Sequence, residues 1–153
     1  MEHDHKDLQD EINRFASNTD FEAIHSEVDA MRTRMGVTAG SSLIRKTAKA
    51  AAVDFTADGE PFGLIHIDGN HDTESVLDDV ANYFPLLAPG NGFLVLDDIS
   101  WTSVKPAVDR VSGGMALIFA RVDSLNDYAV FWNGRSNSKK SRLRKNLALA
   151  AED

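Results

Sequence analysis

Apolar residues near the start of the chain recur three and four positions apart, which is the spacing of an amphipathic helix. Leu8, Ile12 and Phe15 predict a short first helix. A second helix is predicted from Asp20, whose carboxylate can cap free backbone N–H groups, to Gly36, which suits a helix end. The apolar face of this second helix would carry Phe21, Ile24, Val28, Met31 and Met35.

The next residues show shorter patterns. Val37–Ala39 is predicted as a short strand, and Gly40–Ser42 as the turn that leads into a helix through Ala52. Asp54–Pro61 is predicted as a loop. Phe62–Asp68 is a mostly apolar run, too short for a helix and typical of a strand buried on both faces.

A second apolar run, Phe93–Leu96, predicts a neighbouring strand. The intervening helix would begin at Asp72 or Thr73 and bury an apolar stripe. Such a strand–helix–strand unit is expected to form a right-handed parallel crossover. The stripe consists of Val76, Leu77, Val80, Phe84 and Leu87.

The last third of the chain predicts a helix and a hairpin. Pro106 suits the first turn of the helix, which would turn Val104, Val108 and Val111 inward. Residues 115–122 and 128–132 predict two antiparallel strands. Residues 1–134 are therefore taken as one α/β domain, and residues 135–153 as a basic tail or helix.

Composition narrows the classes of function. The 153 residues carry a formal net charge of −8, which argues against nucleic acid as the main partner. The chain has no cysteine, so it has no disulfide, thiol nucleophile or thiolate metal site, and we expect a cytoplasmic location. No apolar stretch approaches the length of about 18 residues needed to span a membrane.

Charge is also distributed unevenly. No Lys or Arg lies between Lys49 and Lys105, although this stretch contains ten acidic residues. Asp68 and the pair Asp97-Asp98 follow the two predicted parallel strands, whose carboxyl ends would open onto one crevice. Three carboxylates there would suit Mg²⁺. The alternative is that Asp97 caps a turn, that Asp98 faces water and that Asp68 caps the next helix.

Three aromatic side chains lie near these acids. His71, three residues after Asp68, could accept a proton from a substrate hydroxyl, or it could be an exposed turn histidine. His66 lies inside the predicted strand and is interpreted as a core or supporting residue rather than a metal ligand. Trp101 could wall the crevice or simply pack in its loop.

Taken together, these segments resemble class I S-adenosylmethionine-dependent methyltransferases, and most of all methyltransferase family 24. This group is related to metal-dependent sugar and macrolide O-methyltransferases and to cephalosporin hydroxylase-like proteins. The resemblance is good from Phe62 to about Val111 and weak before Gly40. The segments that carry it are Phe62–His71, the helix with Asp78 and Asp79, Pro85–Gly90 and Phe93–Asp98.

The resemblance implies a Rossmann-like fold and methyl transfer from S-adenosylmethionine to the hydroxyl of a small molecule. In this interpretation Asp68, Asp97 and Asp98 hold Mg²⁺, and His71 is the general base. Gly40 and Ser41 loosely match a turn that lies near the adenine in relatives, although relatives usually have an acid where this chain has Ser41. Asp68 would also contribute to the cofactor site.

Two parts of the family pattern have no counterpart in this sequence: the glycine-rich loop after the first strand and the acid after the second. The resemblance therefore predicts a sheet that is incomplete at its N-terminal side. We expect the chain alone to bind S-adenosylmethionine weakly or not at all. We also expect the free edge of the strand at residues 62–68 to pair with a second copy or a partner chain.

Other classes of function stay open. A methyltransferase-like domain that only binds a partner would also fit the incomplete pattern. Gly69–Asp72 spells a motif of calcineurin-like metallophosphoesterases, but no histidine follows His71 and the ligands are too few for a dinuclear site. The basic tail could contact an anionic substrate or RNA, although such charge runs more often form a solvated end.

Overall fold

The computed structural model describes residues 17–134. The chain divides into two compact units between Lys46 and Thr47, and each unit is described by itself. The predicted helix at Leu8–Phe15 and the predicted basic tail from residue 135 lie outside the described residues. Within residues 17–134, every helix is too short or too polar to cross a membrane.

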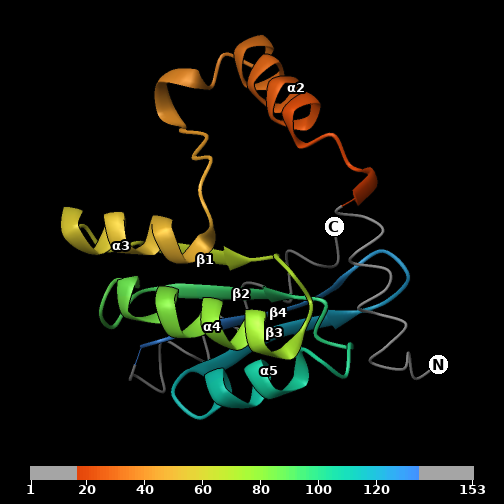
Figure 1. The fold of residues 1–153 in the computed structure, drawn as a ribbon. Coiled ribbons are helices and arrows are strands. Elements are labelled where there is room, and N and C mark those ends of the chain that lie inside the picture. The colour runs from red at the N-terminus through yellow and green to blue at the C-terminus, as the bar shows by residue number, and fades with distance from the viewer. Residues whose placement is uncertain (1–16, 135–153) are drawn as a thin grey trace. The chain divides into compact units, whose positions relative to one another are not determined.

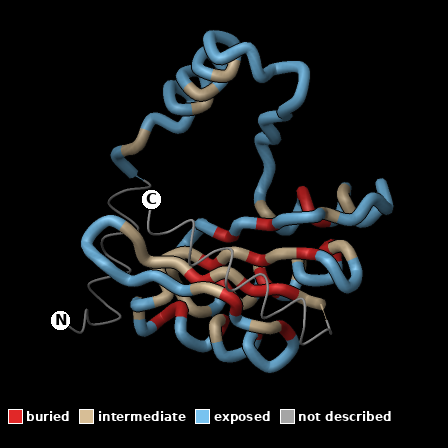
Figure 2. The backbone as a smooth tube through the Cα atoms, turned by 180° about the vertical axis from the view of Figure 1, so that it is seen from behind, coloured by how far each residue is buried: buried red, intermediate tan, exposed pale blue. Residues whose placement is uncertain are grey.

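The N-terminal unit contains the second predicted helix, α2 (Phe21–Arg34). Asp20 caps it as expected, since its carboxylate accepts a hydrogen bond from the Ala23 N–H at 3.0 Å. Gly36 follows the helix with a positive φ of 67°. The prediction of this helix is confirmed, but α2 buries none of its residues, as the colours of Figure 2 show.

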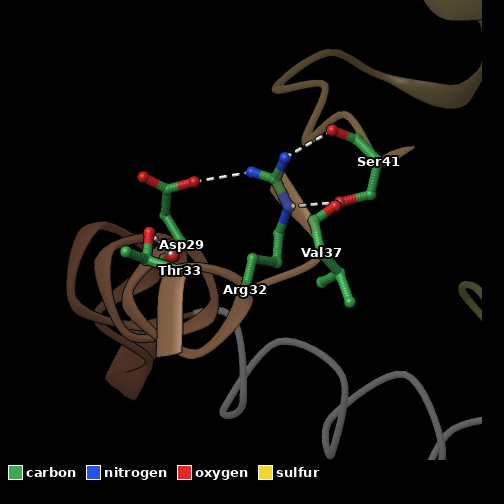
Figure 3. Close-up of polar contacts among 5 residues, drawn as sticks. All are labelled: Asp29, Arg32, Thr33, Val37 and Ser41. Atoms are coloured by element: carbon green, nitrogen blue, oxygen red, sulfur yellow. Dashed lines mark hydrogen bonds and ion pairs between the residues drawn. The ribbon is translucent and has the colours of Figure 1, made fainter. Parts of the chain in front are cut away.

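The strand predicted at Val37–Ala39 is wrong, because Thr38–Gly40 forms a short 3₁₀ helix, η1. Polar contacts with α2 explain the difference (Figure 3). The Arg32 guanidinium donates to the Ser41 hydroxyl at 3.0 Å and to its carbonyl at 2.6 Å, and that hydroxyl donates to the Val37 carbonyl. These bonds fold the segment back on itself, so its backbone is not extended for pairing.

The C-terminal unit is built on a four-stranded sheet with the order β1-β2-β4-β3. β1 (Leu64–Ile67) runs parallel to β2 (Phe93–Asp97), which confirms the predicted parallel pairing of the two strands. β3 (Ala116–Val122) and β4 (Asp127–Trp132) form the predicted antiparallel hairpin, and β4 also pairs with β2. The mixed α/β sheet agrees with the predicted fold class.

Three helices accompany the sheet: α3 (Ala48–Asp58), α4 (Thr73–Tyr83) and α5 (Lys105–Ser112). A 3₁₀ turn, η2 (Phe84–Leu86), follows α4. The loop predicted from Asp54 is wrong as far as Asp58, because α3 continues to a C-cap at Gly59 with a φ of 73°. Glycine tolerates this left-handed conformation at low cost, so it ends the helix here.

The three helices pack on one face of the sheet (Figure 1). On this face β1 contributes Ile65 and Ile67 to the core, whereas Leu64 and His66 point to the other face and are exposed. β1 is therefore buried on one face only, and the prediction that it is buried on both is wrong. The centre of the core contains Val80, Leu94, Leu96, Val104, Val111 and Phe131.

Candidate active site

The carboxyl ends of β1 and β2 bring the predicted acids together. In the parallel register Ile67 lies beside Leu96, so Asp68 and Asp97 occupy the next step of the two neighbouring strands. Carboxylate oxygens of Asp68 and Asp97 lie within 4.8 Å of each other. The same limit holds for Asp68 and Asp98. The structure thus places all three acids at one edge of the sheet.

Asp98 leaves the line of β2 because its backbone is left-handed, with a φ of 52°. It is the one non-glycine residue with a positive φ within residues 17–134. Aspartate adopts this conformation more readily than most residues, and the turn continues with a hydrogen bond from the Trp101 N–H to the Asp98 carbonyl. The Asp98 side chain lies beside His71.

His71 and Asp98 form the shortest contact of the site, with 2.6 Å between His71 Nε2 and Asp98 Oδ2. Nε2 is buried and the contact lacks the angle of a hydrogen bond, so we describe the pair as electrostatic. The Asp68 carboxylate lies further away, at 4.0 Å from Nε2. The Trp101 ring packs against the imidazole with 4.9 Å between ring centres. Trp101 thus both walls the site and packs against the core.

The pKa of Asp98 lies above its usual value. Burial raises the pKa of Asp98 above its usual value, and the charges of Asp97, Asp127 and Asp68 raise it further. His71 opposes this shift and lowers the pKa. The carboxylates therefore repel one another, and a cation bound at this edge would relieve the repulsion.

Asp127 supports the site, although the sequence did not single it out. Its carboxylate accepts hydrogen bonds from both the backbone N–H and the hydroxyl of Ser100. These bonds tie the turn after Asp98 to the start of β4. A residue 27 positions away in sequence gives no local signal for such a contact, so only the pairing of β2 with β4 reveals it.

His66 lies within β1, as predicted, but on the exposed face of the strand. Its side chain is 47% exposed, and its Nε2 lies 3.8 Å from Asp97 Oδ2. The interpretation as a core residue is wrong, because the alternation of β1 turns His66 to the face that carries no helix of the 47–134 unit. His66, Asp68 and Asp97 thus form a second group beside Asp68, His71 and Asp98.

A cavity of about 260 Å³ adjoins β1 near the same edge. Its lining includes Ile65, Ile67, Asp68, Gly69, Asp79 and Tyr83. Burial raises the pKa of Asp79, and the charges of Asp78 and Asp72 raise it further. Gly69 allows the close approach of this carboxylate, since a Cβ there would lie 3.2 Å from Asp79 Oδ2.

Gly40 and Ser41, the other predicted cofactor residues, belong to the N-terminal unit. Gly40 ends η1, and both the hydroxyl and the carbonyl of Ser41 accept hydrogen bonds from Arg32. Their contact with a cofactor stays a prediction. The same holds for metal binding by Asp68, Asp97 and Asp98 and for the role of His71 as a base.

Comparison with known proteins decides the family. The model of methyltransferase family 24, described as a methyltransferase domain, matches residues 2–99, which is more than half of the 153-residue chain. This chain belongs to that methyltransferase family. The match to the methyltransferase domain includes Asp68, His71, Asp97 and Asp98, and it reaches further toward the N-terminus than the resemblance seen in the sequence. No curated protein matches the chain.

Proposed function

We propose that this methyltransferase transfers a methyl group from S-adenosylmethionine to a hydroxyl of a small molecule, with His71 as the general base. The observation that carries the proposal is the contact of His71 with Asp98 at the ends of two adjacent parallel strands. Ligands of open α/β sheets bind at this edge. Membership of the methyltransferase family supports the reaction class.

The geometry assigns separate tasks to the two nitrogens of His71. Nε2 is buried and faces the Asp98 carboxylate, which favours the neutral tautomer with its proton on Nε2. Nδ1 is then the nitrogen that accepts the proton of the substrate hydroxyl. As the imidazole becomes charged, Asp98 stabilises it, and Trp101 holds the plane of the ring.

The family implies Mg²⁺ as well as S-adenosylmethionine, and the donor set fits a divalent cation. Asp68, Asp97 and Asp98 supply hard oxygen ligands at one edge of the sheet. Within residues 17–134 no Lys or Arg forms an ion pair with these three acids. A bound cation lowers the pKa of a substrate hydroxyl, and S-adenosylmethionine supplies an electrophilic methyl group. The acidic edge would hold the cation while His71 accepts the proton.

Replacing His71 tests the proposal. We expect His71→Gln to lower methyl transfer at neutral pH by about 10²–10⁴-fold, the usual contribution of a general base. The loss should shrink as pH rises, because the substrate hydroxyl then ionises without help. The measurement is transfer of labelled methyl from S-adenosylmethionine to a panel of catechols, phenols and sugars by the full chain, at a cofactor concentration high enough to offset the weak binding expected of it.

His25→Gln is the matched control, because His25 lies on α2 in the other unit. It should leave the rate and its pH profile unchanged. Equal activity of His71→Gln and the unmodified chain at neutral pH would contradict the role of His71. Absence of transfer by the unmodified chain across the whole panel would count against the proposed reaction.

A further inference from the structure

Helix α2 carries an apolar stripe that the described part of its own unit does not bury. Ile24, Val28, Met31 and Met35 follow one another at steps of four, three and four residues, which is the spacing of a coiled-coil seam. Ile24, Met31 and Met35 are exposed and Val28 is half-buried. A stripe of this spacing is the face that a helix presents to another helix.

Two oppositely charged residues flank the stripe on the same side. Glu27 and Arg34 are seven residues apart, so they occupy the same place in successive heptads, next to Val28 and Met35. Both are exposed, and neither forms an ion pair within residues 17–134. Charges that flank a seam in this way determine which helices pair and in which direction.

A second copy of α2 that runs antiparallel satisfies both the stripe and the charges. When Val28 of one copy lies beside Met31 of the other, Ile24 lies beside Met35, because a step forward along one helix is a step back along its neighbour. Two-fold symmetry repeats each contact. Glu27 of each copy then comes within reach of Arg34 of the other. Antiparallel pairing also places the positive end of each helix dipole beside a negative end.

Parallel pairing fits the charges less well. It would bring Glu27 toward Arg32 of the second copy, five residues further along the helix. The Arg32 guanidinium already binds the Asp29 carboxylate and two oxygens of Ser41, and its side chain is only 16% exposed (Figure 3). Arg34 would face no acid of the second helix, because it is the last residue of α2.

We propose that α2 pairs antiparallel with α2 of a second copy of this chain. The interface consists of the apolar stripe and of two symmetry-related ion pairs between Glu27 and Arg34. A helix of 14 residues makes a small interface, and small interfaces are weak and transient. The chain should therefore be a monomer at low concentration and a dimer at high concentration. The inference does not depend on methyl transfer or on the acids at the sheet edge.

Sedimentation equilibrium of the full chain between about 1 μM and about 1 mM tests the inference. The mean mass should rise from that of one copy toward that of two. Met31→Gln keeps the length of the side chain and its helix propensity, and it should weaken dimerisation at least about tenfold, because both copies lose a buried methionine. Ser26→Gln, on the opposite side of α2, is the matched control and should change the dissociation constant by less than about twofold.

Exchange of the flanking charges tests the orientation of the pair. Glu27→Lys and Arg34→Glu should each weaken dimerisation by about three- to thirtyfold, because each substitution turns two attractions into repulsions. The double variant that carries both substitutions places opposite charges together again, so it should dimerise as well as the unmodified chain. Circular dichroism confirms that each variant retains its helix.

Three outcomes would overturn the inference. A mass of one copy at about 1 mM would show that α2 does not pair with itself, as expected if another part of the same chain covers the stripe. Dimers that persist unchanged in Met31→Gln would place the interface elsewhere, for example at the free edge of β1. A double variant that dimerises as weakly as the single variants would exclude the antiparallel arrangement.

Discussion

Helices α2 and α4 have the same local design and very different surroundings. Each begins with an aspartate that accepts a hydrogen bond from the backbone N–H three residues later. Each also carries an apolar stripe. In α4 this stripe packs against the sheet and Val80 is only 2% exposed, whereas in α2 Ile24 is 45% exposed. Local sequence signals therefore specify the helix, and the sheet alone decides whether its stripe becomes core.

The charged residues of the two helices also differ, because two acids of α2 are paired with opposite charges, whereas the acids of α4 have no such partner within residues 17–134. On α2, Asp29 pairs with Arg32 at 2.6 Å, and Glu22 pairs with Arg45. The 47–134 unit has no Lys or Arg within residues 50–104, and its acids crowd one another near α4 and the sheet edge. Polar pairs on the surface organise the first unit. A buried core stabilises the second.

The largest effect on stability should come from shortening a buried side chain of α4, compared with an exposed one of α2. Val80→Ala should lower the free energy of unfolding by about 2 kcal/mol, because buried methyl groups are lost and a cavity remains. Ile24→Ala should change it by less than about 0.5 kcal/mol, as is usual for exposed positions. Urea unfolding followed by the fluorescence of Trp101 and Trp132 measures both. Equal shifts would show that α2 is buried in solution.

Removal of the N-terminal caps of α4 and α2 should have an intermediate effect on stability. Asp72 accepts hydrogen bonds from both the N–H and the hydroxyl of Ser75, at 2.9 and 2.6 Å. Asp72→Ala should therefore cost about 1 kcal/mol in the same urea experiment. Asp20→Ala should reduce the far-ultraviolet helix signal but leave the tryptophan transition in place. Asp72→Asn, which keeps an acceptor oxygen, should lose less than Asp72→Ala. A tryptophan transition that moves as far in Asp20→Ala would contradict the comparison.

Much of the fold could be predicted because its signals are local. Apolar runs bounded by turn residues located all four strands, and the caps at Asp20 and Asp72 located the starts of α2 and α4. The errors include one segment held by contacts with another element and one helix end that was placed too early. The Arg32–Ser41 bonds that accompany the turn at η1 join residues nine positions apart. The acids late in α3 read as loop, although the helix continues to a glycine cap.

The sequence predicted where the candidate site lies, but not which of its side chains contact one another. Acids after two buried strands indicated one edge of the sheet, and the structure brings Asp68, Asp97 and Asp98 there. The sequence could not show that Asp98 turns toward His71, because this depends on a single left-handed backbone angle. Nor could it show that His66 faces outward, since that depends on which face of β1 the helices cover.

The smallest effect should come from relieving the crowding of charge on α4. Burial raises the pKa of Asp79, and the charges of Asp78 and Asp72 add to the shift. The folded state therefore binds this proton more tightly than the unfolded state, so ionisation of Asp79 lowers stability as pH rises through the interval between the two pKa values. Asp79→Asn should stabilise the 47–134 unit at pH 7, and the gain should vanish below the pKa of Asp79 in the unfolded chain, at about pH 4.

Asp109→Asn, at an exposed position of α5, is the matched control and should give no such pH-dependent gain. Urea unfolding of the three proteins at pH 3.5, 5 and 7 makes the comparison, and a gain for Asp79→Asn that is the same at all three values would exclude ionisation of Asp79 as its cause.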